Sequence, residues 1–185
     1  MSGGSSRRMH QDKALLPHPL GGTWLSHISG LFLQLGLPVR VLSGHASHQA
    51  LRLTFPAIEV VSEPPPWQGP LKALARLLPL ADENAMFLAP VDMPNLRLDA
   101  MQALIACWHD NPDIAVVAHD GQRLQPLLGI YPFGDLLHRT LDQELREGRS
   151  SWQNWLSRIP HRTVTLPAIQ LLNANSRADL AALQT

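Results

Sequence analysis

Short apolar runs alternate with longer segments of helical spacing along the first two thirds of the chain. The runs are rich in β-branched and large aliphatic residues, are too short for helices and are bounded by Pro, Asn, Asp or Gly, which predicts strands. These predicted strands are residues 39–43, 58–62, 85–89 and 114–118. The predicted helices between them are residues 23–35, 45–54, 71–80 and 98–111. Strands and helices in this alternation predict an α/β fold, and strands that are apolar at nearly every position favour a mostly parallel sheet covered on both faces.

The pattern changes after residue 118. An Asp120-Gly121 turn leads into a predicted strand over residues 122–131, which indicates an antiparallel piece at this point. The remaining predicted elements are helices over 133–147 and 151–158, a strand over 162–166 and a helix over 176–183. No internal repeat or low-complexity tract interrupts this series, so we expect one domain over residues 1–185.

Composition restricts the kind of ligand that the chain can hold. The 185 residues are enough to bury one core, and 45% hydrophobic with 16% charged residues is ordinary for a globular protein. The formal net charge is zero, which argues against wrapping of nucleic acid, so an anionic ligand must be held by a local cluster of charge. The sequence has no apolar run of membrane-spanning length and no secretory signal, and we expect a cytoplasmic protein.

The first candidate site is the glycine-rich, basic N-terminus. Gly3 and Gly4 let the backbone approach a ligand closely, and Ser5 adds a hydroxyl donor. Arg8 and Lys13 add cations, and successive N–H groups in such a loop can form an anion nest, so the segment suits a triphosphate. It is not a P-loop, because the Gly-Lys-Ser/Thr spacing is missing. The alternative is a flexible tail or an expression remnant, since ends rich in Gly and Ser are commonly disordered.

The second candidate site lies just beyond the predicted strand 85–89. Ligands of open α/β sheets bind beyond the carboxyl ends of strands, and Asp92 places a lone carboxylate there, which suits Mg²⁺ because this ion takes few protein ligands. The alternative is that Asp92 only hydrogen-bonds a turn. The nine histidines show no metal-ligand spacing such as HExxH, and His45 and His48 are predicted on an exposed helix face.

Two further segments carry polar chemistry. Gly69 and Pro70 open a predicted helix, where Gly69 lets backbone N–H groups face a base or ribose; a plain helix start is the other interpretation. Glu63, at the end of the preceding strand, can accept hydrogen bonds from a base edge or a sugar. Asn175 offers a carbonyl oxygen to a metal, or else Asn173 and Asn175 are turn and cap residues.

The order of these motifs is more specific than any one of them. From the N-terminus onward the chain reads SGGSSRRMHQDKALL, EPPPWQGPL, APVDMPNL, QPLLGIYP and LNANSRADL. Over residues 2–183 this order resembles the molybdenum cofactor guanylyltransferases, the proteins A of molybdopterin-guanine dinucleotide biosynthesis. That family carries an LAGG-x-S-x-RMG-x-DK loop, a GPL segment, a P-x-D-x-P metal motif, a Pro-led strand and a final N-x-N-x-x-x-D-L. The resemblance implies a Rossmann-like three-layer α/β/α nucleotidyltransferase fold.

The resemblance also implies a role for each matching residue. The implied nucleotide contacts are Gly3, Gly4, Ser5, Arg8, Lys13, Glu63, Gly69, Pro70 and Asp92. The implied catalytic residues are Arg8, Lys13 and Asp92, and the implied ligands of Mg²⁺ are Asp92 and Asn175. The implied contacts of the pterin substrate are Arg149 and Asn173.

The implied reaction is attack by the terminal phosphate of molybdopterin on the α-phosphate of GTP, with pyrophosphate as the leaving group. Mg²⁺ at Asp92 bridges phosphate oxygens and Lys13 offsets charge on the pyrophosphate, while an ionised phosphate nucleophile needs no general base. The expected partners are GTP, molybdopterin and other proteins of the cofactor pathway, without nucleic acid or membrane. The Gly3-Gly4 pair and the Gly-Pro-Leu at residue 69 favour GTP over CTP, which the related cytidylyltransferases use.

The chain departs from the family pattern at three places. No strand precedes the N-terminal loop, which implies a start placed too far downstream or a truncated chain. His10 replaces the usual glycine after Arg-Met, and Lys72 and Ala73 stand where Ala-Gly is common. These departures leave two other hypotheses open: a catalytically weak paralogue that binds a nucleotide or a pathway partner, and another nucleotidyltransferase with the same loop and Asp motif.

Overall fold

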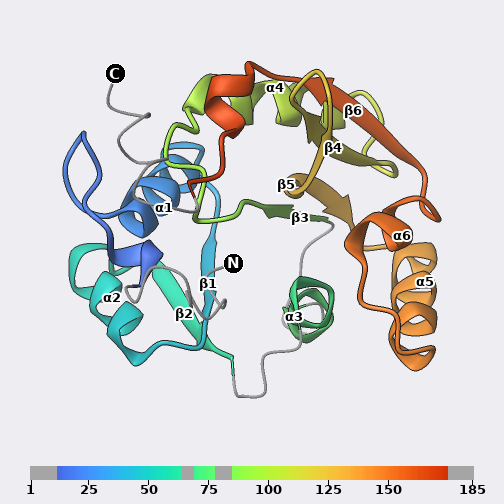
Figure 1. Cartoon of the computed structure of the whole chain (residues 1–185), viewed down its shortest axis with the longest axis horizontal. Coiled ribbons are helices and arrows are strands. Elements are labelled where there is room, and N and C mark those ends of the chain that lie inside the picture. The colour runs from blue at the N-terminus through green and yellow to red at the C-terminus, as the bar shows by residue number, and fades with distance from the viewer. Residues whose placement is uncertain (1–11, 64–68, 78–84, 175–185) are drawn as a thin grey trace. The chain divides into compact units, whose positions relative to one another are not determined.

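The computed structural model describes residues 12–63, 69–77 and 85–174, and Figure 1 labels their helices and strands. The contacts of the chain divide it into two compact units. Of the described residues, unit 1 contains 12–63, 90–98 and 168–174, and unit 2 contains 69–77, 85–89 and 99–167. Each unit has its own sheet among these residues, and one domain over residues 1–185 stays a prediction.

Unit 1 is built on two parallel strands. Its elements are η1 (Lys13–Leu15), α1 (Trp24–Gln34), β1 (Val39–Ser43), η2 (Ala46–Ala50), α2 (Leu51–Thr54), β2 (Ile58–Ser62) and η4 (Ala168–Leu171). α1 packs on β1 and α2 packs on β2. α1 begins in a capping box, because the Thr23 hydroxyl accepts the N–H of Ser26 at 3.2 Å and the Ser26 hydroxyl accepts the N–H of Thr23 at 2.7 Å. One cluster of the buried core of this unit contains Ala14, Leu25, Val39, Val41, Leu51 and Ile58.

Unit 2 is built on four strands in the order β3-β5-β4-β6. Its elements are α3 (Pro70–Leu77), β3 (Ala85–Leu88), α4 (Leu98–His109, of which Leu98 belongs to unit 1), β4 (Ala115–His119), β5 (Leu124–Pro132), α5 (Asp135–Arg146), α6 (Trp152–Leu156) and β6 (His161–Thr165). Two indoles connect the helices to the sheet and to one another. Trp152 Nε1 donates to the Tyr131 hydroxyl at 3.0 Å, and Trp155 Nε1 donates to the Thr140 hydroxyl at 3.1 Å. The spacing of these two tryptophans therefore marks a packed helix face.

The α/β fold and all six predicted strands are confirmed, but the expectation of a mostly parallel sheet is corrected to a mixed one. The strand ends differ from the predicted ones by at most two residues. β1–β2 and β4–β6 pair in parallel, whereas β5 runs antiparallel to both β3 and β4. A local turn accounts for the reversal between β4 and β5, because the Asp120 carboxylate accepts the N–H groups of Gln122 (2.8 Å) and Arg123 (2.7 Å).

The predicted helix over residues 45–54 is the largest local difference. The chain forms the 3₁₀ helix η2 followed by the single turn α2 instead. His48 is fully buried, so its prediction on an exposed helix face is wrong, and His45 is half-buried. The predicted final helix over residues 176–183 lies outside the described residues.

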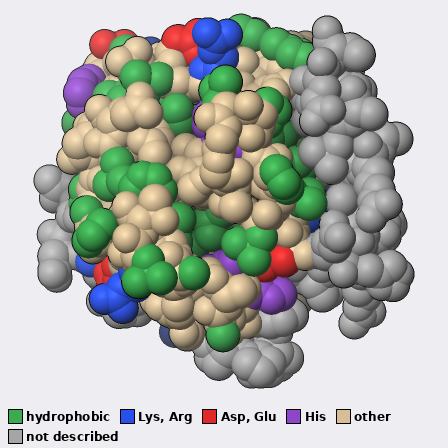
Figure 2. Space-filling view, turned by 90° about the vertical axis from the view of Figure 1, so that its left-hand side faces the viewer, with side chains coloured by type: hydrophobic (Ala, Val, Ile, Leu, Met, Phe, Trp, Pro, Cys, Tyr) green, Lys and Arg blue, Asp and Glu red, His purple; other side chains and the backbone are tan. Residues whose placement is uncertain are grey.

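Among the described residues, no helix combines the length and the hydropathy that a bilayer crossing requires. Figure 2 shows one face on which the described Lys and Arg side chains stand apart and hydrophobic side chains are spread between polar atoms.

Candidate active site

The predicted site residues divide between the two units. Lys13, Glu63, Asp92 and Asn173 belong to unit 1, and their surroundings can be compared directly. The predicted residues of unit 2 are Gly69, Pro70 and Arg149. The predictions for Gly3, Gly4, Ser5, Arg8 and Asn175 fall outside the described residues.

The segment that carries Asp92 is fixed by the chain segment that ends at Ala174. The carbonyl oxygen of Asp92 accepts the N–H of Ala174 at 2.9 Å. Further along, the side-chain oxygen of Gln170 accepts the N–H of Arg97 at 3.1 Å. Two motifs far apart in the sequence therefore lie side by side, and Asn173 is the chain neighbour of the residue that binds Asp92.

Burial and the positive charge of Lys13 both act on the Asp92 carboxyl. Its side chain is half-buried, and burial raises the pKa of this carboxyl above its ordinary value. The Lys13 ammonium acts in the opposite direction and lowers the same pKa. Burial makes the bare carboxylate costly, so a cation bound to Asp92 gains more than it would at an exposed carboxylate.

Lys13 is placed by a turn that its neighbour caps. Lys13 is the first residue of η1, and Asp12 Oδ1 accepts the N–H of Ala14 at 3.1 Å. Ala14 is 1% exposed and belongs to the core of unit 1. The half-buried Lys13 therefore lies on a turn that is stabilised by the burial of Ala14 and by the Asp12 cap.

Glu63 is buried at the end of β2. It is 6% exposed, and its N–H donates to the carbonyl of Ser43 at 2.8 Å, so the backbone pairing of β1 and β2 continues to this residue. Since β1 and β2 are parallel, Ser43 and Glu63 stand together at their carboxyl ends, the edge where α/β sheets bind ligands.

Two histidines that the sequence did not single out hold the chain after Asp92. His18 Nε2 lies 2.8 Å from the carbonyl oxygen of Pro94, and His27 Nε2 lies 2.9 Å from that of Leu96. Their rings are stacked, with centroids 3.8 Å apart and planes within 9° of parallel. A carbonyl only accepts, so both Nε2 atoms carry the proton that makes these bonds.

In unit 2, Gly69 and Pro70 have a clear structural role. Gly69 has a φ of +92°, a conformation that favours glycine, and its carbonyl accepts the N–H of Ala73 at 3.2 Å at the start of α3. A contact of Gly69 and Pro70 with a base or ribose stays a prediction.

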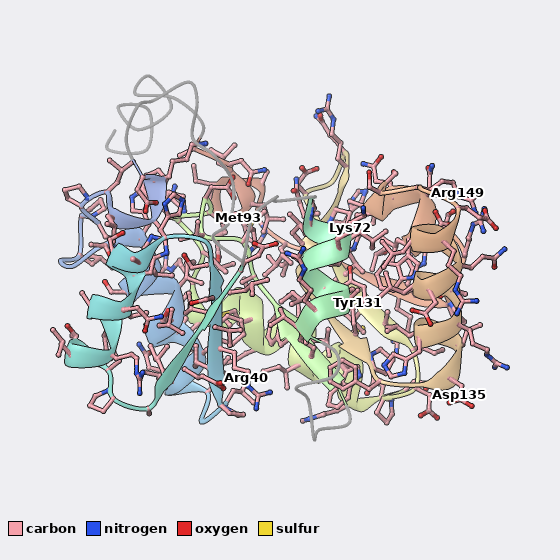
Figure 3. All side chains as sticks on the ribbon, turned by 90° about the horizontal axis from the view of Figure 1, so that it is seen from below. Arg40, Lys72, Met93, Tyr131, Asp135 and Arg149 are labelled. Atoms are coloured by element: carbon pink, nitrogen blue, oxygen red, sulfur yellow. The ribbon has the colours of Figure 1, made fainter. Side chains whose placement is uncertain are left out.

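Arg149 lies just beyond the C-terminal end of α5, whereas Asp135 begins the helix at its other end (Figure 3). Carboxylates hold the Arg149 guanidinium in place. Its Nε and Nη2 donate to the two oxygens of Glu144, each at 3.1 Å, and Nη2 also pairs with Glu147. Glu144 is fully buried and pairs with Arg158 as well, at 3.0 Å. These hydrogen bonds with Glu144 raise the pKa of Arg149, so the guanidinium stays charged. Arg149 therefore balances a buried carboxylate, and its contact with the pterin stays a prediction.

The donor set at Asp92 fits a hard cation that shares its coordination with a ligand. Within residues 12–63, 69–77 and 85–174, no group of three or more His, Cys, Asp or Glu side chains is placed to hold a metal ion. Mg²⁺ is usually bound through one or two carboxylates together with substrate phosphates and water. Asp92 can provide one such carboxylate.

Two relatives match the chain over nearly its whole length. A probable molybdenum cofactor guanylyltransferase of Rhodopirellula baltica is 35% identical, and the match covers 97% of this chain and 87% of that protein. Its namesake from Synechococcus elongatus is 32% identical, with coverage of 100% and 95%.

Two solved structures share the fold. Molybdopterin-guanine dinucleotide biosynthesis protein A from Archaeoglobus fulgidus superimposes with a TM-score of 0.73 at 17% identity, covering 98% of this chain and 93% of that one. A 4-diphosphocytidyl-2C-methyl-D-erythritol synthase superimposes with a TM-score of 0.71 at 18% identity, covering 93% and 92%.

The family model of the MobA-like NTP transferase domain matches residues 1–160. This match spans the Asp-Lys turn, the Gly-Pro-Leu segment and the Pro-Val-Asp-Met-Pro motif. The chain therefore belongs to the MobA-like NTP transferase family, together with the molybdenum cofactor guanylyltransferases that it resembles, and it is a nucleotidyltransferase.

Proposed function

We propose that the chain transfers GMP from GTP to molybdopterin, forming the guanine dinucleotide cofactor and pyrophosphate in the cytoplasm. The observation that carries the proposal is the effect of the Lys13 ammonium on the half-buried Asp92 carboxyl. Both residues lie within the range that the model of a nucleotidyltransferase family matches. The names of relatives with 35% and 32% identity support GTP and molybdopterin as the substrates.

In this proposal Asp92 would hold Mg²⁺ beside the phosphates of the nucleotide. The bound ion supplies neutralisation of phosphate charge. Lys13 binds the β- and γ-phosphates, which leave as pyrophosphate. Arg8 and Asn175 complete the set as a second cation and a second metal ligand.

The reaction needs positioning more than covalent catalysis. An oxygen of the terminal phosphate of molybdopterin forms a bond to the α-phosphorus of GTP. The bond from that phosphorus to the oxygen bridging to the β-phosphate breaks, and its electron pair leaves with pyrophosphate. No proton moves, so no residue acts as a general base, and Lys13 contributes by stabilising the negative charge that develops on the leaving group.

Base selection falls to the buried carboxylate of Glu63. Guanine presents its N1–H and its amino group side by side on one edge, and a carboxylate can accept both bonds. Gly69 and Pro70 line the base and ribose in this proposal, while Arg149 and Asn173 contact the pterin.

The direct test is transfer of label from α-³²P-GTP to molybdopterin with Mg²⁺. We expect the wild type to form a labelled dinucleotide and unlabelled pyrophosphate. Asp92→Asn should lower kcat about 100-fold or more, because this variant keeps the shape of the side chain and removes its charge. Asp142→Asn, an exposed change on α5, is the matched control and keeps the wild-type rate.

The outcome also separates the alternatives. Transfer from CTP in preference to GTP would identify a cytidylyltransferase. Binding of GTP without any transfer would identify a catalytically weak nucleotide-binding paralogue and overturn the proposed reaction.

A further inference from the structure

A chain of hydrogen bonds links the end of β2 to η1 within unit 1. The N–H of Glu63 donates to the carbonyl of Ser43 at 2.8 Å, and Ser43 Oγ lies 2.6 Å from His48 Nδ1. His48 Nε2 lies 2.7 Å from Asp12 Oδ2, while Oδ1 of the same carboxylate accepts the N–H of Ala14 at 3.1 Å. One imidazole thus connects the carboxyl end of β1 with the cap of η1.

The chemistry of the groups fixes the direction of one of these bonds. A carboxylate only accepts, so His48 Nε2 donates to Asp12, while His48 Nδ1 and the Ser43 hydroxyl form the second bond of the ring. The oxygen of that hydroxyl accepts the N–H of His45 at 2.9 Å. His48 is 0% exposed and Ser43 is 3% exposed, so water does not compete for these atoms. Buried bonds of this kind define one geometry, because a broken bond leaves an unsatisfied polar atom.

We propose that His48 is a positioning residue for nucleotide binding: through Asp12 it holds η1 in the conformation that presents Lys13 to the triphosphate. The inference rests on the proposed function, which gives Lys13 its ligand. His48 itself is fully buried, so it does not touch the nucleotide. A lysine side chain is long and flexible, so the place of its charge depends on how firmly its backbone is held.

The same network joins two predicted nucleotide contacts. Glu63 is tied to Ser43 through the backbone, and Lys13 follows Asp12 in the chain. The Ser43–His48–Asp12 bridge therefore sets the distance between the group that binds the base and the group that binds the phosphates. A residue that only filled the core would not need both of its ring nitrogens bonded to these particular partners.

The first test needs no nucleotide. Amide hydrogen exchange is compared in the wild type, His48→Ala, His48→Gln and the control His109→Ala, which removes an exposed imidazole from α4. In His48→Ala we expect the Ala14 amide to exchange about tenfold faster or more, because its acceptor loses its support. His48→Gln keeps an N–H donor toward Asp12 and restores protection, and His109→Ala changes nothing. Unchanged protection of Ala14 in His48→Ala overturns the proposal.

The second test measures binding of GTP with Mg²⁺, and of inorganic tripolyphosphate, by calorimetry. His48→Ala and Lys13→Ala each weaken binding about tenfold, and the double variant is no weaker than Lys13→Ala alone, because His48 acts only through Lys13. Recovery of affinity in His48→Gln excludes a general loss of folding. Additive losses in the double variant, or wild-type affinity in His48→Ala, contradict the proposal. A wild type that binds neither probe overturns the proposed function, while amide exchange still decides whether His48 holds η1.

Discussion

The stacked imidazoles of His18 and His27 place a titratable pair against the chain that follows Asp92. The pKa of His27 lies below its ordinary value, first because the ring is partly buried and also because His18 is close, while the bond to Leu96 acts in the opposite direction. Protonation of both rings would bring two positive charges to a centroid distance of 3.8 Å. The neutral form of His27 is therefore the one that the fold favours.

This preference predicts a loss of stability in mild acid. The folded state binds the His27 proton more weakly than the unfolded state, so its contribution is complete above pH 6.5 and is lost as pH falls from that value through the lowered folded pKa. The free energy of unfolding, measured with denaturant between pH 8 and pH 5, checks this predicted loss of stability. His27→Gln, which keeps a donor for the Leu96 carbonyl, should flatten the dependence, and His109→Gln should leave it unchanged. Equal slopes in wild type and His27→Gln would falsify this origin.

At the scale of single residues, motif reading singled out two residues that the structure brings together. Lys13 and Asp92 stand in ordered motifs, and the structure brings them within electrostatic reach. His48, His18 and His27 have no such signature. Their partners lie 36, 76 and 69 residues away in the sequence, so their roles arise only when the chain folds.

Among the elements, β5 and β4 approach each other closely at Gly129. A Cβ atom on this glycine would lie 2.6 Å from the carbonyl oxygen of Val116 and 3.3 Å from the Cα of Val117. The register between the strands shifts between Val117 and Ala118, at the same place. Glycine is required here by the approach of the two backbones rather than by its φ.

Gly129→Ala should therefore destabilise unit 2. The new methyl meets backbone rather than a flexible side chain, and we expect a loss of about 1–3 kcal/mol in the free energy of unfolding. Gly30→Ala in α1 is the matched control, because a Cβ there meets nothing within 4 Å. That change should stabilise by about 0.5–1 kcal/mol, since alanine is the better helix former. Chemical denaturation gives the free energy of unfolding of both variants. A loss as large in Gly30→Ala as in Gly129→Ala would contradict the steric account.

Element types and the antiparallel pairing of β4 with β5 were predictable, and the other strand pairings were not. Local apolar spacing determined six strands and most helices, because burial selects the face of each element. The antiparallel insertion of β5 between β3 and β4 depends on contacts between strands, of which the sequence showed only the turn at Asp120. The 3₁₀ form of residues 46–50 arose where the bonds of Ser43 and Asp12 to His48 took precedence over helical spacing.

For the whole molecule, ligand binding and stability are linked. The chain has 15 basic and 15 acidic residues, so no net attraction assists a triphosphate and its affinity depends on a few placed charges. A ligand that binds only the folded state stabilises it by about 2.7 kcal/mol at a concentration 100 times its Kd. For a chain of this length, 1 kcal/mol raises the melting temperature by about 2–4 °C.

We therefore expect GTP with Mg²⁺ at such a concentration to raise the melting temperature by about 5–10 °C. Asp92→Ala should abolish the part of the shift that Mg²⁺ adds, because the variant lacks the carboxylate that shares the ion with the phosphates. Asp142→Ala, exposed on α5, should keep the full shift. Differential scanning fluorimetry with GTP, CTP and a sugar phosphate, each with and without Mg²⁺, gives the comparison. A clear shift with CTP or the sugar phosphate and none with GTP would assign the same fold to a different nucleotidyl transfer.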